Sequence, residues 1–188
     1  MTTPTTPTAA TRAAIALGSN LGDSLATLEG ALQALAAATA IDLLACSSWY
    51  RSLAIGPAQP DYLNGCCLIR TTLAAEALLE ELLRIERAFG RVRGERWGPR
   101  TLDLDLLLFG DLQRQEPILT VPHPHMLERP FVLTPLAEIA ADWREPRSGH
   151  TIGELAARLG AGGLLERRPR PAGPPSMPAL ERGQPLAS

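Results

Sequence analysis

Apolar residues recur along this chain at two spacings, and the spacing predicts which segments form strands and which form helices. Short apolar runs bounded by turn-forming residues are typical of strands, and they predict four, over residues 13–17, 41–50, 62–72 and 102–109. Apolar residues three and four positions apart are typical of amphipathic helices, and they predict two, over residues 24–39 and 76–89. The elements therefore follow the order strand, helix, strand, strand, helix, strand.

This order indicates an α/β (α+β) fold of the ferredoxin-like type, with a βαββαβ core. In that fold an antiparallel sheet carries both helices packed on one face. After the core, the sequence predicts C-terminal additions: a Pro-rich turn at residues 121–124 and two more helices over residues 133–140 and 152–159.

The two ends of the chain differ in composition from the middle. Residues 1–12 are rich in Thr and Pro and lack the basic flank and apolar run of a secretory signal, so we expect a disordered leader. Residues 161–188 contain six Pro and four Gly and predict a Pro/Gly-rich disordered tail. Residues 13–160 are then expected to form a single domain.

Composition narrows the classes of function. No apolar run approaches the roughly 18 residues that a membrane helix needs, so we expect a cytoplasmic protein without a membrane partner. A net charge of -2 argues against binding nucleic acid by bulk charge. The three Cys are interpreted as small core residues, because adjacent Cys66 and Cys67 would point to opposite faces of a strand.

Every basic residue counted among the 18 Lys and Arg is Arg. This excludes mechanisms that need a Schiff-base lysine or the lysine of a phosphate-binding loop. Any chemistry on phosphate must therefore use guanidinium groups, backbone N–H groups or a metal ion.

Asp103 and Asp105 are the first candidates for such chemistry. Two positions apart on a strand, both carboxylates emerge on one face, where they repel each other unless a cation lies between them. Hard oxygen ligands favour Mg²⁺, and a pair of ions bridging substrate phosphates is one arrangement of this kind. The alternative is a solvated acidic face without function.

The segment before this strand is strongly basic. Six of the 18 Arg lie between residues 84 and 100, and the Gly-containing loop at 90–100 leads directly into the acidic strand. A guanidinium group can bind two phosphate oxygens at once through two parallel N–H donors. A basic loop beside an acidic strand therefore indicates a site for phosphate and metal. A solvated basic face or a nucleic-acid patch remains the alternative.

Several aromatic and polar residues are weaker candidates. Tyr62 and Asn64 share one face of a predicted strand and offer a ring and an amide to a ligand. Trp97 lies in the basic loop, where it either covers a flat ligand or anchors the loop to the domain. His123 follows a Pro-rich turn and either binds phosphate or lies at the surface.

Four segments, in order, resemble the signature segments of the 6-hydroxymethyl-7,8-dihydropterin pyrophosphokinase family. They are ALGSNLG at 16–22, PDYLN at 60–64, GRVR and RWGPRTLDLD within 90–105, and LTVPH at 119–123. The resemblance spans roughly residues 13–159. It implies a ferredoxin-like enzyme of folate synthesis that transfers pyrophosphate from ATP to the pterin hydroxymethyl group and releases AMP. We expect this enzyme to be a monomer.

The resemblance also implies roles for individual residues, transferred by position. Two Mg²⁺ ions would be held by Asp103 and Asp105. The triphosphate would be clamped by Arg91, Arg93 and Arg100, which with the two Asp form the expected catalytic set. The rest of ATP would be bound by Leu106, Thr120, His123 and Arg129, with Glu86 facing the ribose. The pterin ring would lie between Tyr62 and Phe131, bond to Ser52 and Asn64, and contact Ile55 and Trp97.

Some positions depart from the family pattern. Leu53-Ala54 stands where a Pro pair is common, the basic loop is one residue shorter than in the well-known members, and Ile118 and Pro124 replace a common cation and Tyr. Two other functions fit parts of the sequence. One is an RNA-binding ferredoxin-like module, which needs exposed aromatics on central strands. The other is a two-metal phosphodiesterase, which normally uses more ligands than this motif supplies.

Overall fold

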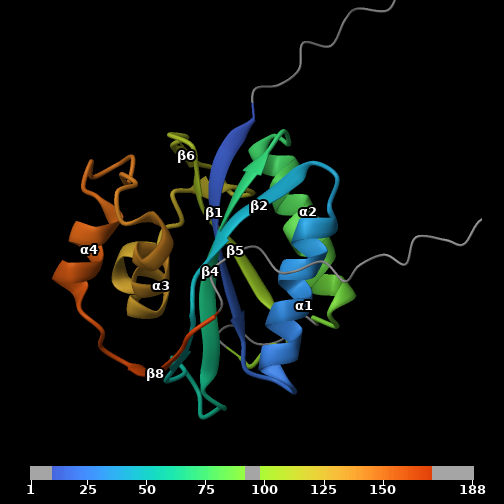
Figure 1. Ribbon diagram of the computed structural model, residues 1–188, viewed down its shortest axis with the longest axis vertical. Helices are drawn as coiled ribbons and strands as arrows, with labels where there is room; N and C mark the ends of the chain where they lie inside the picture. Colours follow the sequence, from blue (N-terminus) through green and yellow to red (C-terminus); the bar gives the residue numbers. More distant parts are fainter. Residues whose placement is uncertain (1–9, 92–97, 171–188) are drawn as a thin grey trace, which may run out of the picture.

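The computed structural model describes residues 10–91 and 98–170, and it consists of three layers. A central sheet separates helices α1 and α2 on one face from α3 and α4 on the other (Figure 1). The helices are α1 (Ser24–Ala37), α2 (Ala75–Ala88), α3 (Pro130–Ala140) and α4 (Ile152–Leu159), with a short 3-10 helix, η1 (Met126–Glu128). The strands are β1 (Thr11–Ser19), β2 (Ile41–Cys46), β3 (Trp49–Ser52), β4 (Tyr62–Thr71), β5 (Asp103–Phe109), β6 (Arg114–Gln115), β7 (Thr120–Val121) and β8 (Leu164–Arg168).

The strand order confirms the predicted ferredoxin-like core. The main sheet runs β5-β1-β4-β3-β8, and β2 pairs with β4 beside β3. Each of these pairings is antiparallel. Because β1 lies between β4 and β5, Gly18 is opposite both Asn64 and Asp103, and Ala16 is opposite Asp105. The topology therefore places the start of β4 and the acidic start of β5 at the same end of the sheet, on either side of β1.

Two hydrophobic clusters cover the two faces of the sheet. One joins the sheet to α1 and α2 and contains Leu104, Leu106 and Cys67. The other joins the sheet to α3 and α4 and contains Cys66 and Leu107. Strand alternation thus sends the two adjacent cysteines to opposite clusters, as the sequence predicts, and both thiols are free and buried. It also directs Asp103 and Asp105 toward the α3 side.

The prediction of one strand over residues 41–50 is wrong. Two strands, β2 and β3, replace it, and they pair with different residues of β4. Residues 47 and 48 separate β2 from β3 and interrupt the pairing of this segment with β4. The Ser47 hydroxyl accepts a hydrogen bond from the Cys66 N–H at 2.9 Å, and Ser48 donates from its N–H and hydroxyl to Glu138 on α3. The bonds from Ser48 to Glu138 draw this segment toward α3 and away from the regular ladder, which explains the break.

The predicted leader and tail both extend too far into the chain. Thr11 and Arg12 belong to β1, and β8 lies within the predicted tail, where it pairs with β3. An edge strand can form from backbone hydrogen bonds while most of its side chains stay exposed, so β8 has little apolar periodicity to reveal it. The rest of the two predicted disordered segments, 1–9 and 171–188, lies outside the described residues.

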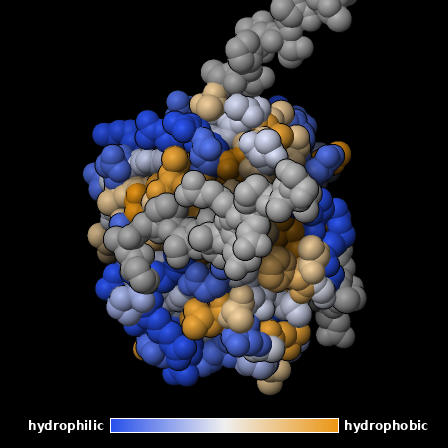
Figure 2. Space-filling view, turned by 45° about the vertical axis from the view of Figure 1, so that its right-hand side comes forward, coloured by the Kyte–Doolittle hydropathy of each residue, from blue (hydrophilic) through white to orange (hydrophobic). Residues whose placement is uncertain are grey.

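The third predicted helix begins earlier than expected. Helix α3 starts at Pro130 rather than at residue 133. Proline suits the first helical turn because a backbone N–H at that position would have no hydrogen-bond partner within the helix. No helix in the described ranges is long and apolar enough to cross a membrane. On the side of the molecule that Figure 2 presents, hydrophobic areas are small and lie among hydrophilic residues.

Candidate active site

A cavity of about 250 Å³ opens where β1 ends and β4 and β5 begin, beside the start of α3. It has a charged wall and an aromatic wall. The charged wall consists of Arg91, Arg100, Asp103, Asp105, His123 and Arg129. The aromatic wall consists of Ser52, Ile55, Tyr62, Asn64 and Phe131. The structure therefore brings together residues that the sequence analysis selected from five separate segments of the chain.

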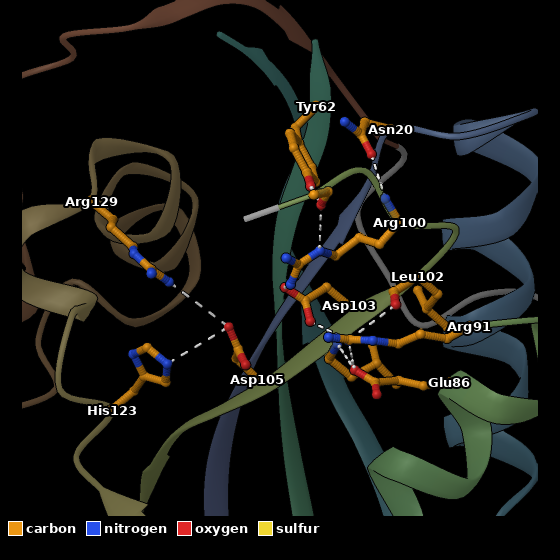
Figure 3. A network of polar contacts seen from close by, with 12 residues as sticks. Asn20, Tyr62, Glu86, Arg91, Arg100, Leu102, Asp103, Asp105, His123 and Arg129 are labelled. Carbon is orange, nitrogen blue, oxygen red and sulfur yellow. Dashed lines mark hydrogen bonds and ion pairs between the residues drawn. The ribbon is translucent and has the colours of Figure 1, made fainter. Parts of the chain in front are cut away.

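Asp103 is held between two arginines (Figure 3). One of its carboxylate oxygens accepts a hydrogen bond from Arg91 Nη1, and the other accepts one from Arg100 Nη1 at 2.9 Å. All three side chains are about one-fifth exposed, so their charges are only partly screened by water. Two guanidinium groups lie at this end of the cavity, which suits it to bind an anion.

Glu86, which the resemblance places facing the ribose of ATP, lies buried beneath Arg91. Its carboxylate accepts hydrogen bonds from Arg91 and, at 2.7 Å, from the Leu104 N–H. Burial raises the pKa of Glu86, and the Leu104 and Arg91 contacts oppose that effect. Glu86 is absent from the cavity wall and instead fixes the guanidinium of Arg91 against the start of β5.

Asp105 lies on the other side of the charged wall, near His123 and Arg129. Its carboxylate is 4.0 Å from Arg129 Nη1 and 3.7 Å from His123 Nε2. Burial in the cavity and, next, the negative charge of Asp103 raise the pKa of Asp105 to about 7. The side chain is still 36% exposed, so a cation or a phosphate group can reach it.

His123 is held at the open edge of β5. Its backbone N–H donates to the carbonyl of Leu107 at 2.9 Å, which fixes the residue beside Asp105. Burial and the positive charge of Arg129 lower the pKa of His123 to about 4. The imidazole is therefore neutral at neutral pH and contacts Asp105 without forming an ion pair with it.

The carboxylates of Asp103 and Asp105 fit a Mg²⁺ site by their chemistry. Mg²⁺ prefers oxygen ligands and binds through one or two carboxylates together with substrate phosphates and water. Burial and, next, the negative charge of Asp103 raise the pKa of Asp105, and a bound divalent cation would favour its ionised form. Within residues 10–91 and 98–170, no group of three or more His, Cys, Asp or Glu side chains forms an all-protein metal cage.

The aromatic wall combines a ring from β4 with a polar edge. Asn64 Nδ2 donates to Ser52 Oγ at 2.8 Å, and the Tyr62 hydroxyl donates to the Gly98 carbonyl at 3.3 Å. A Cβ at Gly18 would lie only 3.0 Å from Asn64 Oδ1, so the glycine leaves room for the Asn64 amide beside β1. Phe131, at the start of α3, contacts the Arg129 guanidinium, 5.8 Å from its ring centre.

Asn20 is a positioning residue that sequence reasoning missed. It is buried, and its Oδ1 accepts from the Arg100 N–H at 2.8 Å while its own N–H donates to the Arg100 carbonyl at 3.1 Å. Its Nδ2 donates to Gln59 Oε1 and to the Pro60 carbonyl, both at 3.0 Å. Asn20 therefore joins the loop that ends at Arg100 to the loop that precedes Tyr62. The available signal was an Asn in the Gly-Ser-Asn loop that follows a predicted strand.

Two further predicted ATP contacts are absent from the cavity. The side chain of Leu106 lies in the cluster beneath α1 and α2, because strand alternation directs it away from Asp105. Thr120 donates its hydroxyl to the Glu116 carbonyl at 3.3 Å and does not line the cavity. Arg93 and Trp97 lie outside the described residues. The wall also contains five residues without a predicted role: Ala16, Leu17, Gly18, Leu53 and Val132.

Comparison with known proteins places the chain in a family. The sequence model of the 7,8-dihydro-6-hydroxymethylpterin-pyrophosphokinase (HPPK) family matches residues 14–141. A Synechocystis protein named 2-amino-4-hydroxy-6-hydroxymethyldihydropteridine pyrophosphokinase is 55% identical over 147 residues, 78% of this chain and 75% of its own. The protein of the same name from Haemophilus influenzae is 45% identical over 156 residues, 82% of this chain and 97% of its own.

Solved structures show the same fold. The crystal structure of wild-type Plasmodium falciparum HPPK-DHPS with SDX-DHP aligns with a TM-score of 0.61 at 12% identity. The alignment covers 79% of this chain and 43% of that chain, so this chain spans less than half of the larger protein. At this identity the likeness concerns the fold alone. The family match over residues 14–141 and the two close relatives lead to one conclusion: the chain belongs to the 7,8-dihydro-6-hydroxymethylpterin-pyrophosphokinase family.

Proposed function

We propose that the cavity between the charged wall and the aromatic wall is where this protein carries out the reaction of its family. That reaction transfers pyrophosphate from ATP to the hydroxymethyl group of 6-hydroxymethyl-7,8-dihydropterin in folate biosynthesis. One observation supports this assignment above others: two carboxylates and three arginines converge on one wall of a cavity whose other wall offers aromatic rings and an amide. The two walls match the two substrates in chemical character.

The charged wall suits the triphosphate of ATP. Arg91, Arg100 and Arg129 present guanidinium groups, which bind phosphate oxygens in pairs and stay charged at any physiological pH. Asp103 and Asp105 would hold Mg²⁺, which when bound neutralises phosphate charge and lowers the pKa of a coordinated hydroxyl. Phosphoryl transfer depends chiefly on positioning and electrostatic stabilisation, and this wall provides both.

The aromatic wall suits the flat pterin ring. Tyr62 and Phe131 offer ring surfaces, while Ser52 and Asn64 offer hydrogen-bonding groups for the polar edge of the heterocycle. In the reaction, the hydroxymethyl oxygen bonds to the β-phosphorus of ATP as the bond from that phosphorus to the α-phosphate oxygen breaks. AMP leaves with the bonding electrons, and the hydroxyl proton is released. The assigned residues hold the two substrates so that this attack is in line.

The structure does not favour the two other functions that the sequence left open. Ferredoxin-like modules that bind RNA use an open sheet face with exposed aromatics, but helices cover both faces of this sheet. A two-metal phosphodiesterase would normally use a larger cluster of ligands than the two carboxylates of the charged wall. The monomeric state, the cytoplasmic location and the absence of a nucleic-acid partner stay predictions from the sequence.

The nucleotide product tests the proposed function. Incubated with ATP, Mg²⁺ and 6-hydroxymethyl-7,8-dihydropterin, the full chain is expected to form AMP and the pterin pyrophosphate in equal amounts. AMP should form only when the pterin is present, because the pterin hydroxyl is the attacking group. Chromatography of the nucleotides distinguishes the outcomes. Formation of ADP, or of AMP without the pterin, would show that the cavity carries out a different reaction.

Replacing Asn20 with Ala is expected to weaken the site through both loops that it joins. Loss of its hydrogen bonds should lower the free energy of unfolding by about 1–3 kcal/mol, and misplacement of Arg100 should lower kcat/KM about tenfold or more. Steady-state kinetics and thermal melting measure the two effects. Asn20→Asp is the matched control, since it keeps the acceptor for the Arg100 N–H and loses the donors to Gln59 and Pro60. An unchanged kcat/KM in Asn20→Ala would contradict the bridging role.

A further inference from the structure

The segment over residues 161–170, which we call the C-terminal strap, runs along the edge of the sheet next to the aromatic wall (Figure 1). Its strand β8 pairs with β3 in a register that places Leu164 opposite Ser52 and Arg168 opposite Trp49. Where β3 ends, the Leu53 N–H donates to the Gly163 carbonyl at 3.0 Å. Because Ser52 and Leu53 both line the cavity, the strap is bonded directly to the backbone of the aromatic wall.

The strap is anchored at its far end by Arg170. Its Nε and Nη2 each donate to a carboxylate oxygen of Glu29 on α1 at 2.7 Å, so the pair is bidentate. The guanidinium also lies over the Trp49 ring, 5.5 Å from its centre, and only 9% of the Arg170 side chain is exposed. A half-buried bidentate pair that also contacts an aromatic ring is stronger than an exposed surface pair, because water screens it less.

The same anchor fixes Trp49, the first residue of β3. The Trp49 Nε1–H donates to Glu29 at 2.8 Å, so Arg170 and Trp49 share one acceptor side chain. The Trp49 ring packs against β4 at Gly65, where a Cβ would lie 2.6 Å from two of its ring carbons. Gly65 adjoins Asn64, whose amide bonds to Ser52. A continuous set of contacts therefore joins Arg170 to the polar edge of the aromatic wall.

A second contact joins the strap to α3 on the opposite face of the sheet. Arg167 Nη2 donates to Glu138 at 2.7 Å, and Glu138 also accepts from Ser48 and the Tyr50 hydroxyl. Helix α3 carries Phe131, the other ring of the aromatic wall. The strap thus touches both elements that present this wall, α3 and the end of β3.

We propose that the C-terminal strap positions the aromatic wall for the pterin, with Arg170 as its anchoring residue. This inference rests on the proposed function, because it assigns the aromatic wall to the pterin. If the strap holds β3 and the loop after it, its loss should leave the charged wall intact and loosen the ring-binding side. The effect is then selective for one of the two substrates, which a general loss of stability would not produce.

Arg170→Ala in the full chain tests this inference, with Arg168→Ala as its control. Arg168 lies on the same strap, is 51% exposed and pairs with Glu166 two positions away. Arg170→Ala is expected to raise the KM for the pterin about tenfold, with the KM for ATP within about twofold of the original chain. Arg168→Ala should leave both within about twofold. All measurements are made well below the melting temperature of each variant.

A partner variant separates positioning from simple unfolding. Glu29→Gln removes the charge that Arg170 contacts but keeps an oxygen for Trp49 Nε1–H, so it should raise the pterin KM in the same selective way. Combined with Arg170→Ala it should add little, since both remove one interaction. Equal rises in both KM values, or no change from Arg170→Ala, would overturn the inference. Absence of pterin-dependent AMP from the unaltered chain would instead overturn the proposed function.

Discussion

Asp105→Ala is expected to lower kcat by about 1000-fold, the largest effect of any single change in the cavity. Asp105 supplies one of the two carboxylates that would hold Mg²⁺, and the charged wall offers no third carboxylate to replace it. Without it, the guanidinium groups remain but the phosphate charge is only partly neutralised. The loss corresponds to about 4 kcal/mol of transition-state stabilisation.

The same change should not destabilise the fold. Burial and the charge of Asp103 raise the pKa of Asp105 to about 7, so the folded state binds its proton more tightly than the unfolded chain does. The ionised carboxylate therefore costs stability, and this cost grows as the pH rises toward 7 and is fully present above it. In metal-free buffer at pH 8, the melting temperature of Asp105→Ala is expected to equal or exceed that of the original chain.

Asp111→Ala provides the control, because Asp111 is an exposed acid in the turn after β5 and does not line the cavity. It should leave kcat and the melting temperature unchanged. Steady-state kinetics at saturating Mg²⁺ and thermal melting without metal are the two measurements. Normal turnover in Asp105→Ala would show that the metal role assigned to this residue is wrong, whereas a large fall in its melting temperature would show that the carboxylate is structural.

Arg100→Ala is expected to lower kcat/KM about 100-fold or more while changing the melting temperature little. The Arg100 guanidinium faces the cavity and bonds to Asp103, but Asp103 keeps its second partner, Arg91, when Arg100 is removed. The bonds that Arg100 makes with Asn20 come from its backbone and survive the substitution. The loss should therefore concern phosphate binding rather than folding.

Two arginine variants sharpen this test. Arg84→Ala removes an exposed guanidinium that pairs with Glu81 on α2, away from the cavity, and should leave kcat/KM within about twofold. Arg100→Lys keeps the positive charge but loses the fork, so it should recover only part of the activity. Equal activity in Arg100→Ala and Arg84→Ala would contradict a role for Arg100 in binding phosphate. We expect a similar loss of activity in Arg93→Ala, although Arg93 itself lies outside the described ranges.

Local pattern was sufficient for most of the fold because each element of the core is amphipathic. The helix α2 has apolar residues at every turn, and β5 alternates Asp103 and Asp105 with core leucines. Such periodicity depends only on neighbours in the sequence. The break at residues 47–48 could not be read in this way, because its cause is Glu138 on α3, 90 positions further along the chain.

The residues of the candidate site also divide into those that local sequence reveals and those that depend on contacts between distant segments. Asp103, Asp105 and the surrounding arginines were identified because like charges on one strand and a basic loop beside it are visible in sequence. The burial of Glu86 beneath Arg91 could not be predicted, because it depends on how α2 packs against β5. Asn20 was missed because its partners, Arg100 and Pro60, come from two distant loops.

The sequence by itself determined the order of the core elements, the alternation that exposes Asp103 and Asp105 together, and the absence of lysine from any phosphate chemistry. Those properties follow from the identity and spacing of near neighbours. Only the tertiary structure decided which acidic groups face the cavity and which hold an arginine in place. It also decided that part of the supposed tail forms strand β8 beside the aromatic wall, and that Arg170 after this strand pairs with Glu29. Burial and hydrogen bonding between distant segments settle such questions, and neither is encoded in local periodicity.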